Sequence, residues 1–340
     1  MTEQVPFSVL DLCPVRSGET PRDALHQTVE LARAVEVLGF KRFWVAEHHG
    51  AQTVASAATS VVIGHIAGKT STIRVGSGGV MLPNHSPLVV AEQFGTLDSL
   101  YPGRIDLGVG RSSGSVSDGI THALRSTPEA RERFPSDLRE VKSLFRKYTP
   151  DQAIRAVPGA GLDVPIWLLG SSTFSAQQAA TLGLPFAFAT HIGPDALGAA
   201  IEVYRSTFKP SMALSHPYVM ICVVVTAADT DAAAQYLFTS FQQMTVGHVR
   251  GTHGTLPPPT ADLGAFATLD EERTLMERSW RHAITGSVET VQRRAEALID
   301  ETAADELMVL TVIYDQDARR RSFQIVGKVR DRINAQKQAP

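Results

Sequence analysis

The chain alternates short apolar runs with longer segments of helical period, and this alternation limits its fold more than any other feature. Eight apolar runs stand between turn residues, each too short for a helix, and several lack the polar alternation of a half-exposed strand. They are residues 7–12, 42–46, 73–78, 104–109, 164–169, 186–189, 218–226 and 307–314. Helices are predicted at 22–38, 55–70, 87–100, 128–148, 175–182, 195–208, 228–250, 287–302 and 318–335.

Eight buried strands, each followed by a helix, exceed the roughly five or six strands of an open doubly wound sheet. We therefore predict an α/β fold, a closed (βα)8 TIM barrel that forms a single domain over residues 1–340. A plain barrel needs about 250 residues. The surplus lies in two insertions, 110–163 after the fourth strand and 228–286 after the seventh. Both follow strand ends, so we expect them over the C-terminal face, where barrel active sites are built.

Charge and cysteine content exclude several classes of partner. Thirty-two Lys and Arg against 35 Asp and Glu give a net charge of −3, without the basic excess of a nucleic-acid-binding protein. Cys13 and Cys222 lie far apart in apolar runs, which predicts buried thiols and neither a disulfide nor a metal site. No signal peptide or membrane-spanning run is recognisable, so we expect a cytoplasmic protein without membrane contact.

The end of the second predicted strand carries Glu47, His48 and His49 at the reactive rim of the barrel. Such side chains exchange protons near neutral pH, although paired surface or structural histidines remain the alternative. Metal binding is not favoured, because adjacent strand residues point to opposite sides and no nearby Cys or Asp completes a ligand set. His191 follows the sixth strand and either faces the same pocket or caps a loop.

Two further strand ends suggest ligand contacts. Glycines at 76, 78 and 79 in and after the third strand fit either a flat ligand ring or a tight bend of the backbone. Residues 167–173 (WLLGSST) run from a strand into a helix, whose first amides and hydroxyls suit an anion, although a helix cap needs only one hydroxyl. Arg111 would add positive charge, unless it is an ordinary surface arginine.

Two segments come close to nucleotide-binding motifs without matching them. Residues 64–70 (GHIAGKT) have too few residues between the glycines of a phosphate-binding loop and end a predicted helix. Residues 108–114 (GVGRSSG) follow a strand, but their third glycine is displaced from the dinucleotide fingerprint. The sequence therefore predicts no nicotinamide site.

Taken together, these segments resemble the bacterial luciferase-like monooxygenases, flavin-dependent enzymes built on a (βα)8 barrel. The resemblance covers nearly the whole chain, and it is greatest to the single-chain branch of uncharacterised bacterial enzymes and tailoring oxygenases of secondary metabolism. It rests on residues 44–49 (WVAEHH), 75–87 (VGSGGVMLPNHSP), 91–94 (AEQF), 101–108 (YPGRIDLG) and 169–172 (LGSS).

The resemblance implies a role for each of these sites. His48 would be the catalytic proton-transfer residue beside the flavin, and the bond between Gly78 and Gly79 would be a cis peptide beneath the flavin ring. Arg111 would contact the FMN phosphate together with serines of the following strand and helix. The predicted cofactor-binding residues are Glu47, Ser77, Gly78, Gly79, Gly110, Arg111, Leu169, Gly170, Ser171, Ser172 and Ser175, with no metal ligand.

Two departures from the family pattern argue against light emission. Gly110 stands where the light-emitting catalytic subunit has a reactive cysteine, and Ser171 stands where those enzymes have a carboxylate. The resemblance implies a monooxygenase that uses reduced FMN (FMNH2) and O2 through a C4a-hydroperoxyflavin to oxygenate a small hydrophobic or aromatic molecule. The apolar candidates for its pocket are Phe7, Phe174, Phe188 and Phe266.

The implied partners are a separate flavin reductase that supplies FMNH2 and a second copy of the chain in a homodimer. Two other functions remain open. The same fold supports hydride transfer with the deazaflavin F420, whose long acidic tail needs a basic groove such as Arg111, Arg125, Arg131 and Arg133 would form. The chain is alternatively a non-catalytic flavin-binding partner, although the presence of both His48 and Arg111 favours an enzyme.

Overall fold

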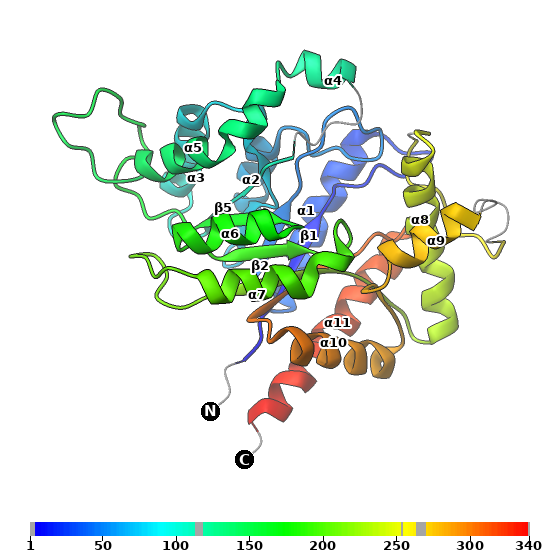
Figure 1. Cartoon of the computed structure of the whole chain (residues 1–340). Coiled ribbons are helices and arrows are strands. Elements are labelled where there is room, and N and C mark those ends of the chain that lie inside the picture. Colours follow the sequence, from blue (N-terminus) through cyan, green and yellow to red (C-terminus); the bar gives the residue numbers. More distant parts are fainter. Residues whose placement is uncertain (1–3, 113–117, 253, 263–269, 339–340) are drawn as a thin grey trace.

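Eight parallel strands close into a barrel in the computed structural model, which describes residues 4–112, 118–252, 254–262 and 270–338 (Figure 1). Each strand pairs with the next, and the last pairs with both the seventh and the first, which closes the ring. The predicted TIM barrel is therefore confirmed. The strands are β1 (Phe7–Asp11), β2 (Arg42–Val45), β3 (Arg74–Ser77), β5 (Ile105–Gly110), β6 (Ile166–Gly170), β7 (Phe186–Ala189), β8 (Val219–Ala227) and β10 (Glu306–Leu310).

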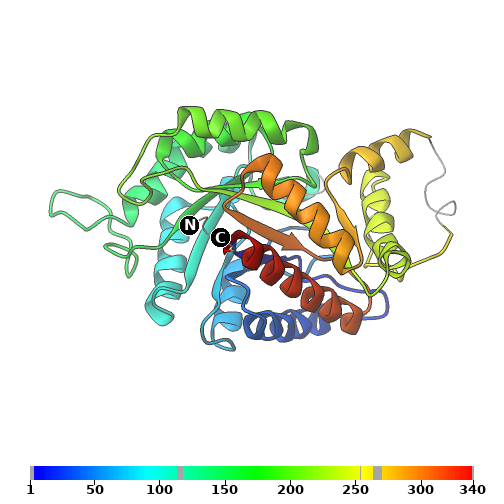
Figure 2. The same ribbon diagram turned by 90° about the horizontal axis from the view of Figure 1, so that it is seen from below.

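Every predicted helix has a counterpart outside the barrel, and Figure 2 shows α11 beside α1 and α10. Thr20 and Asp23 form a capping box that starts the first helix, with Pro21 in its first turn. The second helix is shorter than predicted because it begins at Thr59. The nine predicted helices are α1 (Pro21–Val37), α2 (Thr59–Ala67), α3 (Pro87–Leu100), α5 (Pro128–Leu144), α6 (Thr173–Leu182), α7 (Leu197–Thr207), α8 (Asp231–Val249), α10 (Val288–Thr302) and α11 (Gln316–Gln338).

Half of the elements that the sequence analysis missed, namely α4, α9 and β9, lie in the two insertions. The first insertion holds α4 (Asp118–Ala123) before α5, and Figure 1 shows α4 on the side opposite the chain ends. The second holds α8, α9 (Asp270–Ser279) and β9 (Ile284–Gly286), which pairs with β8. The others are β4 (Val80–Met81), η1 (Leu82–Asn84) and η2 (Pro194–Ala196). Among the described helices, none is both long and apolar enough to cross a bilayer.

A layer of buried ion pairs fills the barrel interior at the N-terminal ends of the strands. Arg42 on β2 donates to Asp106 Oδ2 on β5 and to Glu306 Oε1 on β10, each at 2.7 Å. The Arg42 side chain is only 5% exposed and both carboxylates are fully buried. These pairs join strands that are far apart in sequence and that do not pair directly in the ring, since β3 lies between β2 and β5 and β1 lies between β2 and β10.

Aromatic rings lie directly above this layer. Trp44 Nε1 donates to Asp106 Oδ2 at 3.1 Å, and the guanidinium of Arg42 stacks 4.7 Å from the centroid of Trp167. The two indole rings meet edge to face with centroids 5.3 Å apart. The charged layer and the tryptophans together fill the lower half of the barrel interior, so a ligand would bind above them, toward the C-terminal face.

We expect Arg42→Met to lower the free energy of unfolding by about 3 kcal/mol, because two buried carboxylates lose their shared cation, while Arg74 still pairs with Asp106 and Lys41 with Glu306. Urea denaturation followed by far-UV circular dichroism measures this loss. The matched control is Arg321→Met, which removes an exposed ion pair with Asp229 and should leave the midpoint nearly unchanged. Equal midpoints for the two variants would contradict the role assigned to the buried layer.

Candidate active site

A cavity of about 1060 Å³ lies above the tryptophan floor, at the C-terminal ends of the strands. Its floor is apolar, and its upper wall comes partly from α8 and the segment that follows it, within the second insertion. Ligand pockets typically enclose about 300–1,000 Å³, so this cavity can hold a cofactor together with a small substrate. The floor residues are Leu10, Trp44, Ala187, Met220, Met308 and Leu310.

His48 lies on one wall of the cavity and is half-buried. Its Nδ1 is buried and has no hydrogen-bond partner among the described residues, which leaves Nε2 as the nitrogen available to a ligand. Burial lowers the pKa of His48, and the nearby Glu47 carboxylate opposes this effect only in part. His48 is therefore neutral near pH 7 and can accept a proton.

His191, which follows β7, and Cys222, on the neighbouring β8, both line the cavity. Nδ1 of His191 lies 4.0 Å from Sγ of Cys222. The pocket-facing alternative for His191 is thus confirmed. Burial, with a smaller contribution from His48, lowers the pKa of His191 to about 4. Burial raises the pKa of Cys222 to about 12, so its thiol is not a nucleophile at neutral pH, and both cysteines are buried and free as predicted.

We expect acid to destabilise the protein partly through His191. Its pKa falls from 6.5 to about 4 on folding, so between these values the unfolded chain binds more protons and stability decreases as the pH falls. His191→Gln should reduce the acid-induced loss by about 2 kcal/mol, because between pH 7 and pH 4.5 the unfolded chain binds most of a proton that the folded chain does not. Urea midpoints at pH 7 and pH 4.5 test this, and an unchanged difference would contradict it.

The opposite end of the cavity combines Arg111 with the N-terminus of α6. The guanidinium of Arg111 lies 4.2 Å from the ring centroid of Phe174, in the first turn of that helix. Ser172 is the N-cap, and Ser175 Oγ donates to the Ser172 carbonyl at 2.8 Å, so this hydroxyl is engaged within its own helix. A helix N-terminus beside an arginine suits an anion such as a phosphate.

Gly78 and Gly79 form a third part of the wall, and their peptide bond is cis, as the resemblance implies. A Cβ atom on Gly78 would lie 2.5 Å from Leu10 Cδ1, and one on Gly79 would lie 2.9 Å from the carbonyl oxygen of Gly108. Close approach of the Leu10 side chain and of the Gly108 backbone therefore disfavours a larger residue here. A flat ring against this wall stays a prediction.

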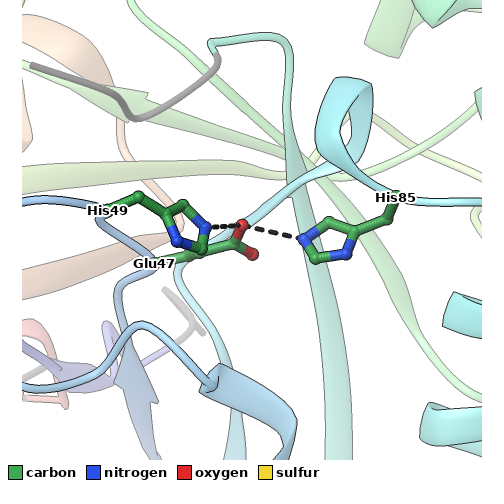
Figure 3. A group of neighbouring side chains, drawn as sticks. All are labelled: Glu47, His49 and His85. Carbon is green, nitrogen blue, oxygen red and sulfur yellow. Dashed lines mark hydrogen bonds and ion pairs between the residues drawn. The ribbon is translucent and has the colours of Figure 1, made fainter. Parts of the chain in front are cut away.

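Glu47 stands behind the cavity wall and joins two histidines (Figure 3). His49 Nε2 and His85 Nε2 both lie 2.8 Å from Glu47 Oε1, and the Met81 amide donates to Oε2 at 3.1 Å. Burial alone would raise the pKa of Glu47, but the hydrogen bonds, led by that from His85, outweigh it and hold the pKa below its usual range. Glu47 is therefore an anion throughout the neutral range.

The cavity brings together most of the predicted site residues. Among the described lining residues are His48, Gly78, Gly79, Gly110, Arg111, Leu169, Gly170, Ser171, Ser172 and Ser175. Glu47 and Ser77 are not part of this lining, because Glu47 binds His49 and His85 while Ser77 Oγ donates to the Gly108 carbonyl at 2.8 Å. For these two residues, direct contact with a cofactor stays a prediction.

The predicted aromatic lining was only partly right. Phe174 lines the cavity, whereas Phe7 and Phe188 pack between the strands and the surrounding helices because their side chains point outward. Phe266 lies outside the described residues. The sequence analysis assigned no role to His85, which it quoted only within a longer motif. It also overlooked His248, which lines the cavity from α8. No periodicity marked either position, and only the motif around residues 83–87 pointed to His85.

The family model and the most similar relatives agree on one protein family. The model of the luciferase-like monooxygenase family matches residues 5–312. The chain is 46% identical over 334 residues to a luciferase-like monooxygenase of Escherichia coli K12, covering 98% of this chain and 99% of that protein. It is 43% identical over 192 residues to the N-acetyl-S-alkylcysteine monooxygenase of Bacillus subtilis, covering 55% of this chain and 58% of that protein.

Solved structures resemble this fold over nearly its whole length. Apo-MsnO8 superposes with a TM-score of 0.84 at 34% identity, covering 96% of this chain and 99% of that one. An oxygenating 3,6-diketocamphane monooxygenase from Pseudomonas putida in complex with FMN gives 0.72 at 17% identity, covering 96% and 97%. An F420-dependent secondary alcohol dehydrogenase gives 0.67 at 16%, covering 96% and 98%. The last two show a shared fold only.

Proposed function

Because the chain belongs to the luciferase-like monooxygenase family, we propose that it is an FMN-dependent monooxygenase that transfers one oxygen atom from O2 to a small hydrophobic or aromatic molecule. One observation carries the proposal. A single apolar cavity has a neutral histidine, His48, on one wall and an anion-binding end, formed by Arg111 and the α6 N-terminus, on another. The family allows flavin or deazaflavin chemistry, and this combination favours FMN.

The residues present fit FMN in size and charge. The wall at Gly110 is open toward the described residues, of which a Cβ atom there would meet Met81 Sδ alone within 4 Å, at 3.7 Å. Arg111 and the first turn of α6 would hold the phosphate, and the Gly78–Gly79 wall would support the ring. When bound, reduced FMN supplies the electrons that activate O2. His48 Nε2 would accept or return a proton, and the apolar floor would exclude water.

Since the sequence has no dinucleotide fingerprint, we propose that a separate flavin reductase supplies FMNH2, and that the enzyme works as a homodimer. The substrate class follows from the floor, which is apolar and has no charged residue among those described. Thioethers belong in the first substrate panel because a relative oxygenates N-acetyl-S-alkylcysteine. That match covers little more than half of the chain, so neutral aromatic compounds belong in the panel too.

The deazaflavin alternative needs a basic groove for an acidic tail. Of the four arginines that the sequence offered for such a groove, only Arg111 and Arg131 lie among the described lining residues, and Arg125 and Arg133 do not. Arg250 also lines the cavity but pairs with Glu272 Oε1 at 2.6 Å. This distribution suits the single phosphate of FMN better than a polyanionic tail.

We expect Arg111→Ala to weaken FMN binding by roughly 10- to 100-fold, because a charge-assisted contact is worth about 1.5–3 kcal/mol. Quenching of flavin fluorescence measures the dissociation constant. Riboflavin, which lacks the phosphate, should bind wild type and variant alike. Arg133→Ala, an exposed arginine on α5 away from the cavity, is the control for a general loss of positive charge. Equal weakening of riboflavin and FMN would contradict the phosphate assignment.

The activity test mixes the protein with chemically reduced FMN, admits O2 and follows hydrogen peroxide release. We expect release several-fold slower than from free FMNH2, and faster release again from His48→Ala. Product formed from the substrate panel, with peroxide reduced in proportion, establishes oxygen transfer. FMN binding without any change in peroxide release would favour the non-catalytic partner, and turnover with F420 but not FMN would favour hydride transfer.

A further inference from the structure

Glu47, His49 and His85 form a compact cluster outside the cavity lining, and the proposed chemistry does not use it. Figure 3 shows the two imidazole rings on either side of the Glu47 carboxylate, with both Nε2 atoms directed at Oε1. The carboxylate is 2% exposed, whereas the His49 and His85 side chains are 18% and 30% exposed. The cluster joins the end of β2 to the segment that follows β4.

Two His and one Glu also make a conceivable metal site, since their ligand atoms lie within 4.8 Å of one another. A metal ion would need a point about 2 Å from all three ligand atoms. Oε1 itself lies between the two nitrogens (Figure 3), and Oε2 already accepts the Met81 amide. The arrangement is therefore complete as a set of hydrogen bonds, with each Nε2–H donating to Oε1.

This cluster connects two walls of the cavity. His48 stands between Glu47 and His49 in the chain, so both neighbours of the proton-transfer residue are fixed. On the other side, His85 and the Met81 amide belong to the segment that continues from Gly78 and Gly79. Met81, Gly78 and Gly79 all line the cavity.

His48 itself depends on such a support. Its Nδ1 has no hydrogen-bond partner among the described residues, so no side-chain bond at that nitrogen holds the ring in place. The orientation of the imidazole must come from packing and from the backbone at residues 47–49. A catalytic group is useful only when its position is held to within a fraction of an ångström.

We propose that Glu47, His49 and His85 form a metal-free positioning clamp that fixes His48 at a set distance from the Gly78–Met81 wall. This inference rests on the proposed function, because it gives the clamp a purpose only if His48 acts on a ligand held against that wall. His85 is the informative member, because it lies 38 residues from Glu47 in sequence, outside the cavity lining, and its ring is hydrogen-bonded to the Glu47 carboxylate.

The first experiment compares His85→Leu, which removes the donor, with His85→Gln, whose amide can still donate to Glu47. We expect His85→Leu to speed peroxide release from the FMNH2-loaded protein to nearly the rate of His48→Ala, and His85→Gln to restore most of the protection. His282→Leu is the matched control, because His282 is half-buried and hydrogen-bonded to the Pro194 carbonyl at 3.1 Å, away from the cavity.

A double variant separates positioning from general stability. If His85 acts through His48, His85→Leu should add nothing to the peroxide release of His48→Ala, whereas independent structural damage would add its own effect. The thermal unfolding midpoint of every variant is measured as well, to detect a general loss of stability. An additive effect, or no effect of His85→Leu where His48→Ala has one, overturns the clamp and leaves the proposed function standing. If His48→Ala leaves peroxide release unchanged, the proton-transfer role that the proposed function gives to His48 is wrong.

Nuclear magnetic resonance of cofactor-free protein with 15N-labelled histidine gives a readout without turnover. We expect His49 and His85 to show the tautomer protonated at Nε2, and the His48 ring signals to shift and broaden in His85→Leu but not in His282→Leu. Metal analysis of the purified protein and titration with Zn²⁺ complete the test. One equivalent of tightly bound metal that His85→Leu abolishes would overturn the metal-free clamp.

Discussion

The buried contact of Arg42 with Asp106 and Glu306 is the constraint on which the rest of the structure depends. It binds β2, β5 and β10 across the barrel interior and supports the indole of Trp44 through the same Asp106 oxygen. A buried ion layer is stable only when every charge is paired, which fixes the register of these strands. The cavity above the tryptophans then lies at the face where strand ends carry reactive side chains.

The cavity has an uncharged part and a positively charged end. Its floor is apolar, and two of its histidines, His48 and His191, are neutral near pH 7 because burial lowers their pKa values. Positive charge is placed at the Arg111 end, beside the α6 N-terminus. We propose that this division orients a ligand with an apolar body and one anionic group, and that the proposed clamp behind the wall keeps His48 in place relative to that ligand.

The sequence predicted the structure correctly where the conformation of a short segment depends mainly on its own residues. The buried runs predicted the strands, and the LGSS segment with Ser172 and Ser175 predicted a strand followed by a capped helix. The WVAEHH segment placed His48 at a strand end facing the cavity. The same segment did not show where the side chains of Glu47 and His49 lie. Their hydrogen-bonded cluster also needs His85, which is 38 residues from Glu47 in the sequence.

The sequence by itself determined the order of strands and helices, the place of the insertions and the residue types at the strand ends. Hydrophobic periodicity and turn chemistry are local, so they survive without a structure. Only the tertiary structure decided that Phe7 and Phe188 face the helices, that His191 and His248 reach the cavity, and that Glu47 lies behind its wall. Those outcomes depend on how the closed sheet rotates each strand and brings distant segments together, which no single segment encodes.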